Sequence, residues 1–124
     1  MIRLFKACEP SPLIHENPPP DWTLPKGTVW LDLVSPTRQE ELAVEHAVGL
    51  QVPTPEEMAE IESTSRLYRQ GEATYLTADL LYHTDALLPL TGPVTFILSN
   101  GPLVTVRYSE PRAFKILGEK FDRE

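Results

Sequence analysis

The sequence predicts a single mixed α/β (α+β) domain, in which helices pack on the faces of a mixed sheet. The chain has 124 residues, which suits one domain, and its hydrophobic fraction of 41% is close to that of soluble globular proteins. A strand–helix segment comes early, and a run of hairpin-linked strands and a last helix follow it. This order is typical of a sheet with a parallel part and an antiparallel part.

The first third of the chain is predicted to hold two strands separated by a loop. Met1–Ala7 alternates weakly between apolar and polar residues, which indicates a short strand. Residues 8–27 contain six of the 13 prolines and are expected to form an extended loop, because proline cannot donate a hydrogen bond to a sheet. Val29–Leu33 is an almost continuous apolar run, typical of a strand covered on both faces. Trp30 in this run is expected to be buried under a helix.

A first helix is predicted after Thr37. Thr37 and Glu40 have the spacing of a capping box, and Gly49 suits the end of a helix whose last residue is Val48. The residues expected to face the core are Leu42, Ala43, Ala47 and Val48. The residues expected to face solvent are Glu40, Glu41 and Glu45.

A second, short helix is predicted over about residues 55–63. Thr54 and Glu57 repeat the capping-box spacing, and Pro55 suits the first helical position. Met58 and Ile61 are expected to face inward, and Ser63–Ser65 to end the helix.

Four further strands are predicted, over Arg66–Gln70, Ala73–His83, Val94–Ser99 and Leu103–Tyr108. Gly71 joins the first two. Asn100–Gly101 joins the last two and predicts a type I′ turn, which needs positive φ at both central residues. Pro111 is expected to start a last helix.

The acidic charge is concentrated in one segment. Residues 32–62 contain eight acidic residues and one base, Arg38, and so carry the whole net charge of −7. A net charge of this sign argues against nucleic acid held through phosphates and against docking on an anionic membrane. No apolar run is long enough to span a bilayer, no secretory signal is visible, and the single Cys8 cannot form an internal disulfide.

Motifs for catalysis are missing, so the chain is not expected to be an enzyme. The six glycines are too scattered for a phosphate-binding loop, and no two histidines have the spacing of a zinc helix. An alternative, a small enzyme using Asp32, His83 or Asp85, would require these groups to converge in one pocket.

Three carboxylates are predicted to share one face of the second helix. Glu56 and Glu60 are four residues apart, and Glu57 and Glu60 are three apart. Mg²⁺ prefers oxygen ligands and takes one or two carboxylates while keeping several waters. The face therefore suits a cation, although an acidic helix face is often only solvated.

Three blocks of sequence resemble the CorA-type magnesium transporters. The blocks are Trp30–Thr37, Pro53–Leu67, and the pair Val94–Leu98 with Leu103–Tyr108. They occur in the order and spacing of that family and cover most of residues 28–112. The zinc-transporting ZntB branch is similar but matches less well between Ile61 and Leu67.

The resemblance implies that residues 1–124 are one N-terminal cytoplasmic domain with an α/β/α sandwich fold. It would belong to a homopentameric channel for Mg²⁺, and often Co²⁺ or Ni²⁺, on the cytoplasmic side of the prokaryotic inner membrane. The stalk and transmembrane helices of the family are not in this sequence, so the chain is expected to be a fragment that makes no membrane contact itself and cannot conduct ions.

In the family, Mg²⁺ bound between neighbouring subunits holds the channel closed. Aligned by the second block, one of its acidic ligands falls on Glu60, with Glu56 and Glu57 beside it. The resemblance thus implies a regulatory Mg²⁺ bound by these residues, weakly in the isolated chain. The alternative is a freestanding interaction or binding module of the same fold.

Overall fold

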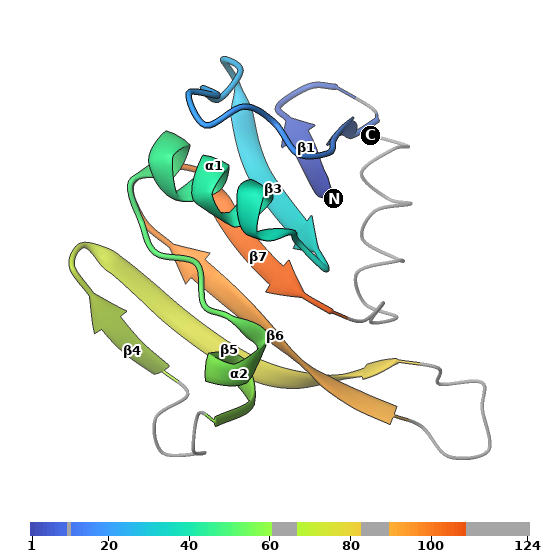
Figure 1. The fold of residues 1–124 in the computed structure, drawn as a ribbon, viewed down its shortest axis with the longest axis vertical. Helices are drawn as coiled ribbons and strands as arrows, with labels where there is room; N and C mark the ends of the chain where they lie inside the picture. The colour runs from blue at the N-terminus through green and yellow to red at the C-terminus, as the bar shows by residue number, and fades with distance from the viewer. Residues whose placement is uncertain (10, 61–66, 83–89, 109–124) are drawn as a thin grey trace.

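The computed structural model describes residues 1–9, 11–60, 67–82 and 90–108. These residues form seven strands and two helices (Figure 1), in the order β1 (Ile2–Lys6), β2 (Leu13–His15), β3 (Thr28–Val34), α1 (Arg38–Val48), α2 (Pro55–Glu60), β4 (Leu67–Gln70), β5 (Ala73–Tyr82), β6 (Leu90–Leu98) and β7 (Leu103–Arg107).

All seven strands belong to one mixed sheet, in the order β2-β1-β3-β7-β6-β5-β4. β3 and β7 run parallel at its centre, and every other neighbouring pair is antiparallel. The centre of the sheet therefore joins an N-terminal group of strands to a C-terminal meander. The predicted mixed sheet with helices is confirmed.

The two faces of the sheet carry different clusters of buried side chains. One face packs against both described helices, and its cluster includes Leu31 from β3, Val44 from α1 and Met58 from α2. The opposite face carries a smaller cluster of Phe5, Trp30 and Val94. Because successive side chains of a strand point to opposite faces, Trp30 and Leu31 enter different clusters.

Trp30 is buried, as predicted, with only 6% of its surface exposed. Its ring stacks on Phe5, with the ring centroids 4.3 Å apart. Neither α1 nor α2 covers it, since both lie on the other face of the sheet.

Both predicted capping boxes are present. The backbone N–H of Glu40 donates to the Thr37 hydroxyl at 3.2 Å, and the Glu40 carboxylate accepts from the Thr37 N–H at 2.9 Å. Gly49 ends α1 in the left-handed region, with φ of 80°. Ile61, the helix end at Ser63–Ser65 and the helix expected from Pro111 lie outside the described residues.

The proline-rich segment is more ordered than a plain extended loop, which corrects the prediction for residues 8–27. Leu13–His15 forms β2, which pairs antiparallel with β1. Farther on, the side-chain amide of Gln39 donates to the carbonyls of Asn17 and Pro18. The middle of the segment is therefore fastened both to the sheet, through β2, and to the start of α1, through Asn17 and Pro18.

The predicted inner and outer faces of α1 are partly wrong. Glu40 and Glu41 are buried, with 1% and 5% exposed, whereas Leu42 is 47% exposed. Ala43 is buried as predicted, and Val44, which was not predicted, is buried beside it. The spacing of apolar residues predicted the wrong face because it takes no account of polar partners. In the structure both buried glutamates have charged or hydrogen-bonding partners.

The predicted type I′ turn at Asn100–Gly101 is also wrong. The described residues with positive φ do not include Asn100 or Gly101, and the connection between β6 and β7 has four residues. A two-residue turn would pair Ser99 with Pro102, whose nitrogen has no hydrogen to donate. The paired residues of β6 and β7 therefore lie beyond the whole four-residue connection, which includes Pro102.

Glu40 joins three segments of the chain. Its carboxylate accepts from the Met1 ammonium at 2.7 Å and from the Asn17 N–H at 3.0 Å, besides its bond to Thr37. Burial alone would raise the pKa of Glu40, but these hydrogen bonds and the ammonium charge hold it below its ordinary value of 4.5. The ionised form is therefore the one that the fold stabilises.

We expect Glu40→Gln to lower the free energy of unfolding by about 1.5–3 kcal/mol at pH 7, because it removes charged hydrogen bonds. A carboxylate whose pKa is lowered in the folded state contributes stability above its unfolded pKa and loses it as pH falls through the folded pKa. Urea unfolding at pH 7 and pH 3 would therefore show a difference between wild type and variant that shrinks at the lower pH. A difference that stays constant would contradict this role of the ionised carboxylate.

Candidate metal-binding site

The three carboxylates predicted as metal ligands all belong to α2. Glu56 and Glu57 lie in its first turn with exposed side chains, and Glu60 is its last residue. Met58 from the same helix is buried in the main core cluster. The helix therefore presents acidic residues to solvent while Met58 attaches it to the sheet.

Glu57 has a local role as well. Its backbone N–H donates to the Thr54 hydroxyl at 3.1 Å, and its carboxylate accepts from the Thr54 N–H at 3.4 Å. A carboxylate near the positive end of a helix is favourable there. The bond to the Thr54 N–H is long, so it holds this carboxylate only weakly.

Carboxylates from both α1 and α2 lie near Tyr108. Burial and the nearby carboxylates of Glu41 and Glu56 raise the pKa of Tyr108 to about 12. The Tyr108 hydroxyl donates to the Glu41 carboxylate at 3.4 Å, and Arg38 donates to the same carboxylate at 2.9 Å. Glu41 is thus paired with a base.

Among the described residues, the candidate acidic side chains do not form a complete set of metal ligands. Where side chains are described, no three His, Cys, Asp or Glu residues come together as a metal site. The Glu60 side chain lies outside the described part of the chain, so its place on the face of Glu56 and Glu57 rests on helical spacing.

The alternative catalytic set is not assembled in the described residues. Asp32 is fully buried in an ion pair with Arg107, and it also accepts a hydrogen bond from the Thr105 hydroxyl at 2.9 Å. His83 and Asp85 lie outside the described residues. Asp32 has a structural environment rather than that of an accessible acid.

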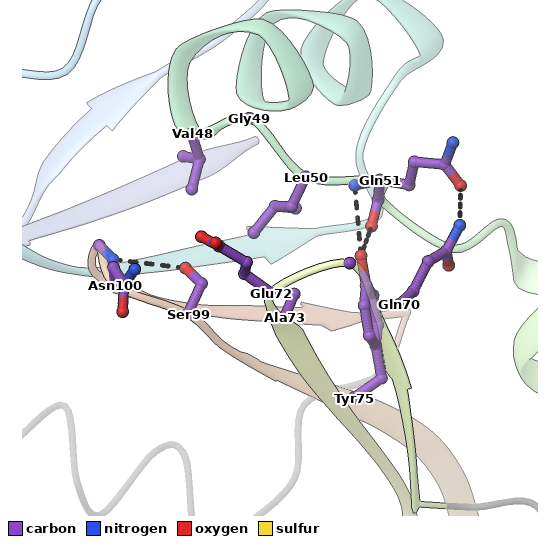
Figure 2. Close-up of a pocket in the computed structure, with 12 residues that line it drawn as sticks. Val48, Gly49, Leu50, Gln51, Gln70, Glu72, Ala73, Tyr75, Ser99 and Asn100 are labelled. Carbon is purple, nitrogen blue, oxygen red and sulfur yellow. Dashed lines mark hydrogen bonds between the residues drawn. The ribbon is translucent and has the colours of Figure 1, made fainter.

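Two pockets flank the segment that leads from α1 to α2. One, of about 330 Å³, lies beside α2 and is lined by residues that include Glu45, Glu57 and Tyr68. The other, of about 380 Å³, lies between the end of α1, the β4–β5 turn and the β6–β7 loop (Figure 2). Gln51, Gln70 and Tyr75 line both pockets and so form the wall between them.

These wall residues were missed by the sequence reasoning. Figure 2 shows the Tyr75 hydroxyl meeting the backbone of Gln51, and the side chains of Gln51 and Gln70 meeting each other. Tyr75 and Gln51 are 24 residues apart. No local pattern marks such a pair, because it depends on where β5 passes the end of α1.

The fold resembles a solved transporter structure. The complete structure of the CorA magnesium transporter from Methanocaldococcus jannaschii matches 98% of this chain and 36% of that chain, with a TM-score of 0.65 and 12% identity. No protein-family model matches the sequence. Among curated proteins, the magnesium transport protein CorA of Wolinella succinogenes is 32% identical over 98 residues, which are 76% of this chain. The chain belongs to the CorA family.

A second CorA relative supports this assignment. The magnesium transport protein CorA of Escherichia coli K12 is 27% identical over 90 residues, or 73% of this chain. The present CorA chain spans only 30% and 28% of the lengths of the two curated relatives. Across its described residues, no helix is both long and apolar enough to cross a membrane.

Proposed function

We propose that this CorA-family domain senses Mg²⁺ on the cytoplasmic side of a prokaryotic inner membrane and regulates a divalent-cation channel. In this proposal Glu56, Glu57 and Glu60 contribute carboxylates to a cation site shared with a neighbouring subunit of a homopentamer. The observation that carries the proposal is the exposed acidic helix α2 in a chain of this family.

The chemistry of α2 supports a hard cation. Like charges three and four residues apart destabilise a helix by about 0.2–0.5 kcal/mol per pair, and a bound cation would remove that repulsion. Carboxylate oxygens are the ligands that Mg²⁺ prefers, and one or two of them suffice if waters complete the coordination.

The names of the relatives support the transport role. The curated relatives from Wolinella succinogenes and Escherichia coli are both magnesium transport proteins. Since this chain matches under a third of each, transport itself belongs to the longer protein in this proposal, and sensing belongs to the domain.

We expect the 124-residue chain to bind Mg²⁺ with a dissociation constant in the millimolar range, about 4 kcal/mol, because a single helix supplies few ligands. Titration followed by NMR should shift the amide signals of α2, and Glu60→Gln should weaken that shift. Glu16→Gln, which changes an exposed acid in the proline-rich segment, is the matched control. Equal shifts in the Glu60 and Glu16 variants would contradict the assignment of Glu60.

In a full-length channel carrying this domain, Glu60→Ala should leave transport active at higher internal Mg²⁺ than in wild type. The fold should survive, since the change removes a like charge. If the variant and wild type close at the same Mg²⁺ concentration, the sensor role of Glu60 is wrong. A freestanding interaction module would then be the better interpretation of the acidic face.

A further inference from the structure

The position of α2 depends on the segment that precedes it. α2 has only six residues, and a helix this short is not stable by itself in water. Of its described side chains, only that of Met58 is buried. One buried side chain does not define an orientation, and among the described residues the segment 49–54, which links α1 to α2, can add to it.

A tyrosine from β5 holds this link. The Tyr75 hydroxyl donates to the carbonyl of Gln51 at 2.6 Å and accepts from the Gln51 N–H at 3.2 Å (Figure 2). One hydroxyl therefore satisfies both backbone groups of a residue that belongs to no helix or strand. Tyr75 is 2% exposed, so the ring that carries this hydroxyl has little freedom to move. We call the two hydrogen bonds between Tyr75 and Gln51 the clasp.

The next residue is held as well. The Val52 N–H donates to the Glu45 carboxylate at 3.2 Å, and Val52 itself is buried. Burial raises the pKa of Tyr75, and the charge of Glu45 adds to this effect against the lowering by the hydrogen bond to Gln51. The hydroxyl therefore keeps the proton that it donates in the clasp.

We infer that Tyr75 is a positioning residue for α2: through the clasp it fixes the link and so sets where the α2 carboxylates stand. The part of this inference that concerns cation affinity rests on the proposed function above. The part that concerns the placement of α2 is independent of any metal.

The neighbouring tyrosine provides a matched control. The ring of Tyr68 stacks on that of Tyr75, with centroids 4.9 Å apart and planes 6° from parallel. Both tyrosines line the pocket beside α2, but the hydroxyl that bonds to Gln51 belongs to Tyr75. Tyr75→Phe and Tyr68→Phe each keep the stacked rings and remove one hydroxyl, and only the first breaks the clasp.

The test measures hydrogen exchange of the metal-free chain, at the Met58 amide of α2 and at the core Val104 amide as a reference. The Met58 amide donates to the Thr54 carbonyl and touches neither tyrosine hydroxyl. Tyr75→Phe should speed exchange at Met58 by about tenfold relative to its effect at Val104, a size at the lower end of that expected for two lost hydrogen bonds. Tyr68→Phe should leave that ratio unchanged.

A Mg²⁺ titration of the same variants completes the test. The dissociation constant should rise by about threefold in Tyr75→Phe and stay at the wild-type value in Tyr68→Phe, consistent with a modest loss of preorganisation. If both variants match wild type at Met58, the positioning role is wrong. If Met58 responds but Mg²⁺ affinity does not, the clasp places α2 without serving a cation site. If wild type itself shows no Mg²⁺ shift at α2, the proposed function fails, and the exchange result alone decides the role of the clasp.

Discussion

Arg107→Met is expected to lower the free energy of unfolding by about 3–5 kcal/mol, because it leaves the buried Asp32 carboxylate with only the distant Arg3 guanidinium, at 3.5 Å, as a cationic partner. Both side chains are fully buried. The Arg107 Nη2 atom lies 2.8 Å from Oδ2 of Asp32, and its Nε lies 3.1 Å from Oδ1. The pair spans β3 and β7, the one parallel junction in the described sheet.

The double variant Asp32→Leu with Arg107→Met should be more stable than Arg107→Met alone, since replacing both charges removes the unpaired group. Urea unfolding of wild type, both single variants and the double variant measures this. Arg69→Met is the control, because Arg69 lies in β4 with an exposed side chain. Its unfolding curve should stay close to wild type. A double variant as unstable as the sum of the singles would show that Arg107 acts through other contacts.

Trp30→Ala is expected to cost about 3–5 kcal/mol, the range for removing a large aromatic side chain from a core. The indole stacks on Phe5, and its N–H donates to the Thr105 hydroxyl at 2.9 Å. That hydroxyl in turn donates to Asp32, so the ring lies at the end of a chain of hydrogen bonds that reaches the ion pair.

Trp30→Phe separates the contribution of ring packing from that of the indole N–H hydrogen bond. It keeps an aromatic ring beside Phe5 and loses the N–H, so its cost should be well below that of Trp30→Ala. Thermal melts followed by circular dichroism compare the three proteins. A melt of Trp30→Ala that coincides with wild type would mean that the Phe5–Trp30 stack adds nothing to the fold. Because Trp30 and Arg107 belong to one network, their effects should not add in a double variant.

Local sequence signals predicted most of the elements. The capping boxes at Thr37 and Thr54 lie within three residues of their partners, and the structure contains both. The strand at Val29–Leu33 and the two strands joined at Gly71 were also predicted, because their signals lie in neighbouring residues of the sequence. The acidic helix α2, which carries the candidate site, was also predicted from spacing alone.

Predictions failed where the environment of a residue depends on a partner that is distant in sequence, or on an adjacent proline. Glu40 looked like a solvent-facing residue, yet it is buried because Met1 and Asn17, far away in sequence, donate to it. The Asn100–Gly101 signal failed through its own neighbour, Pro102, which cannot complete the turn.

The sequence by itself determined the helix starts and six of the seven described strands, since each depends on residues two to four positions apart. The tertiary structure decided the burial of Asp32 and the position of α2. Asp32 meets Arg107 across 75 residues through the parallel register of β3 and β7, and Gln51 meets Tyr75 across 24. A buried polar group needs its partner at hydrogen-bond distance, and only the packing of the sheet places such partners.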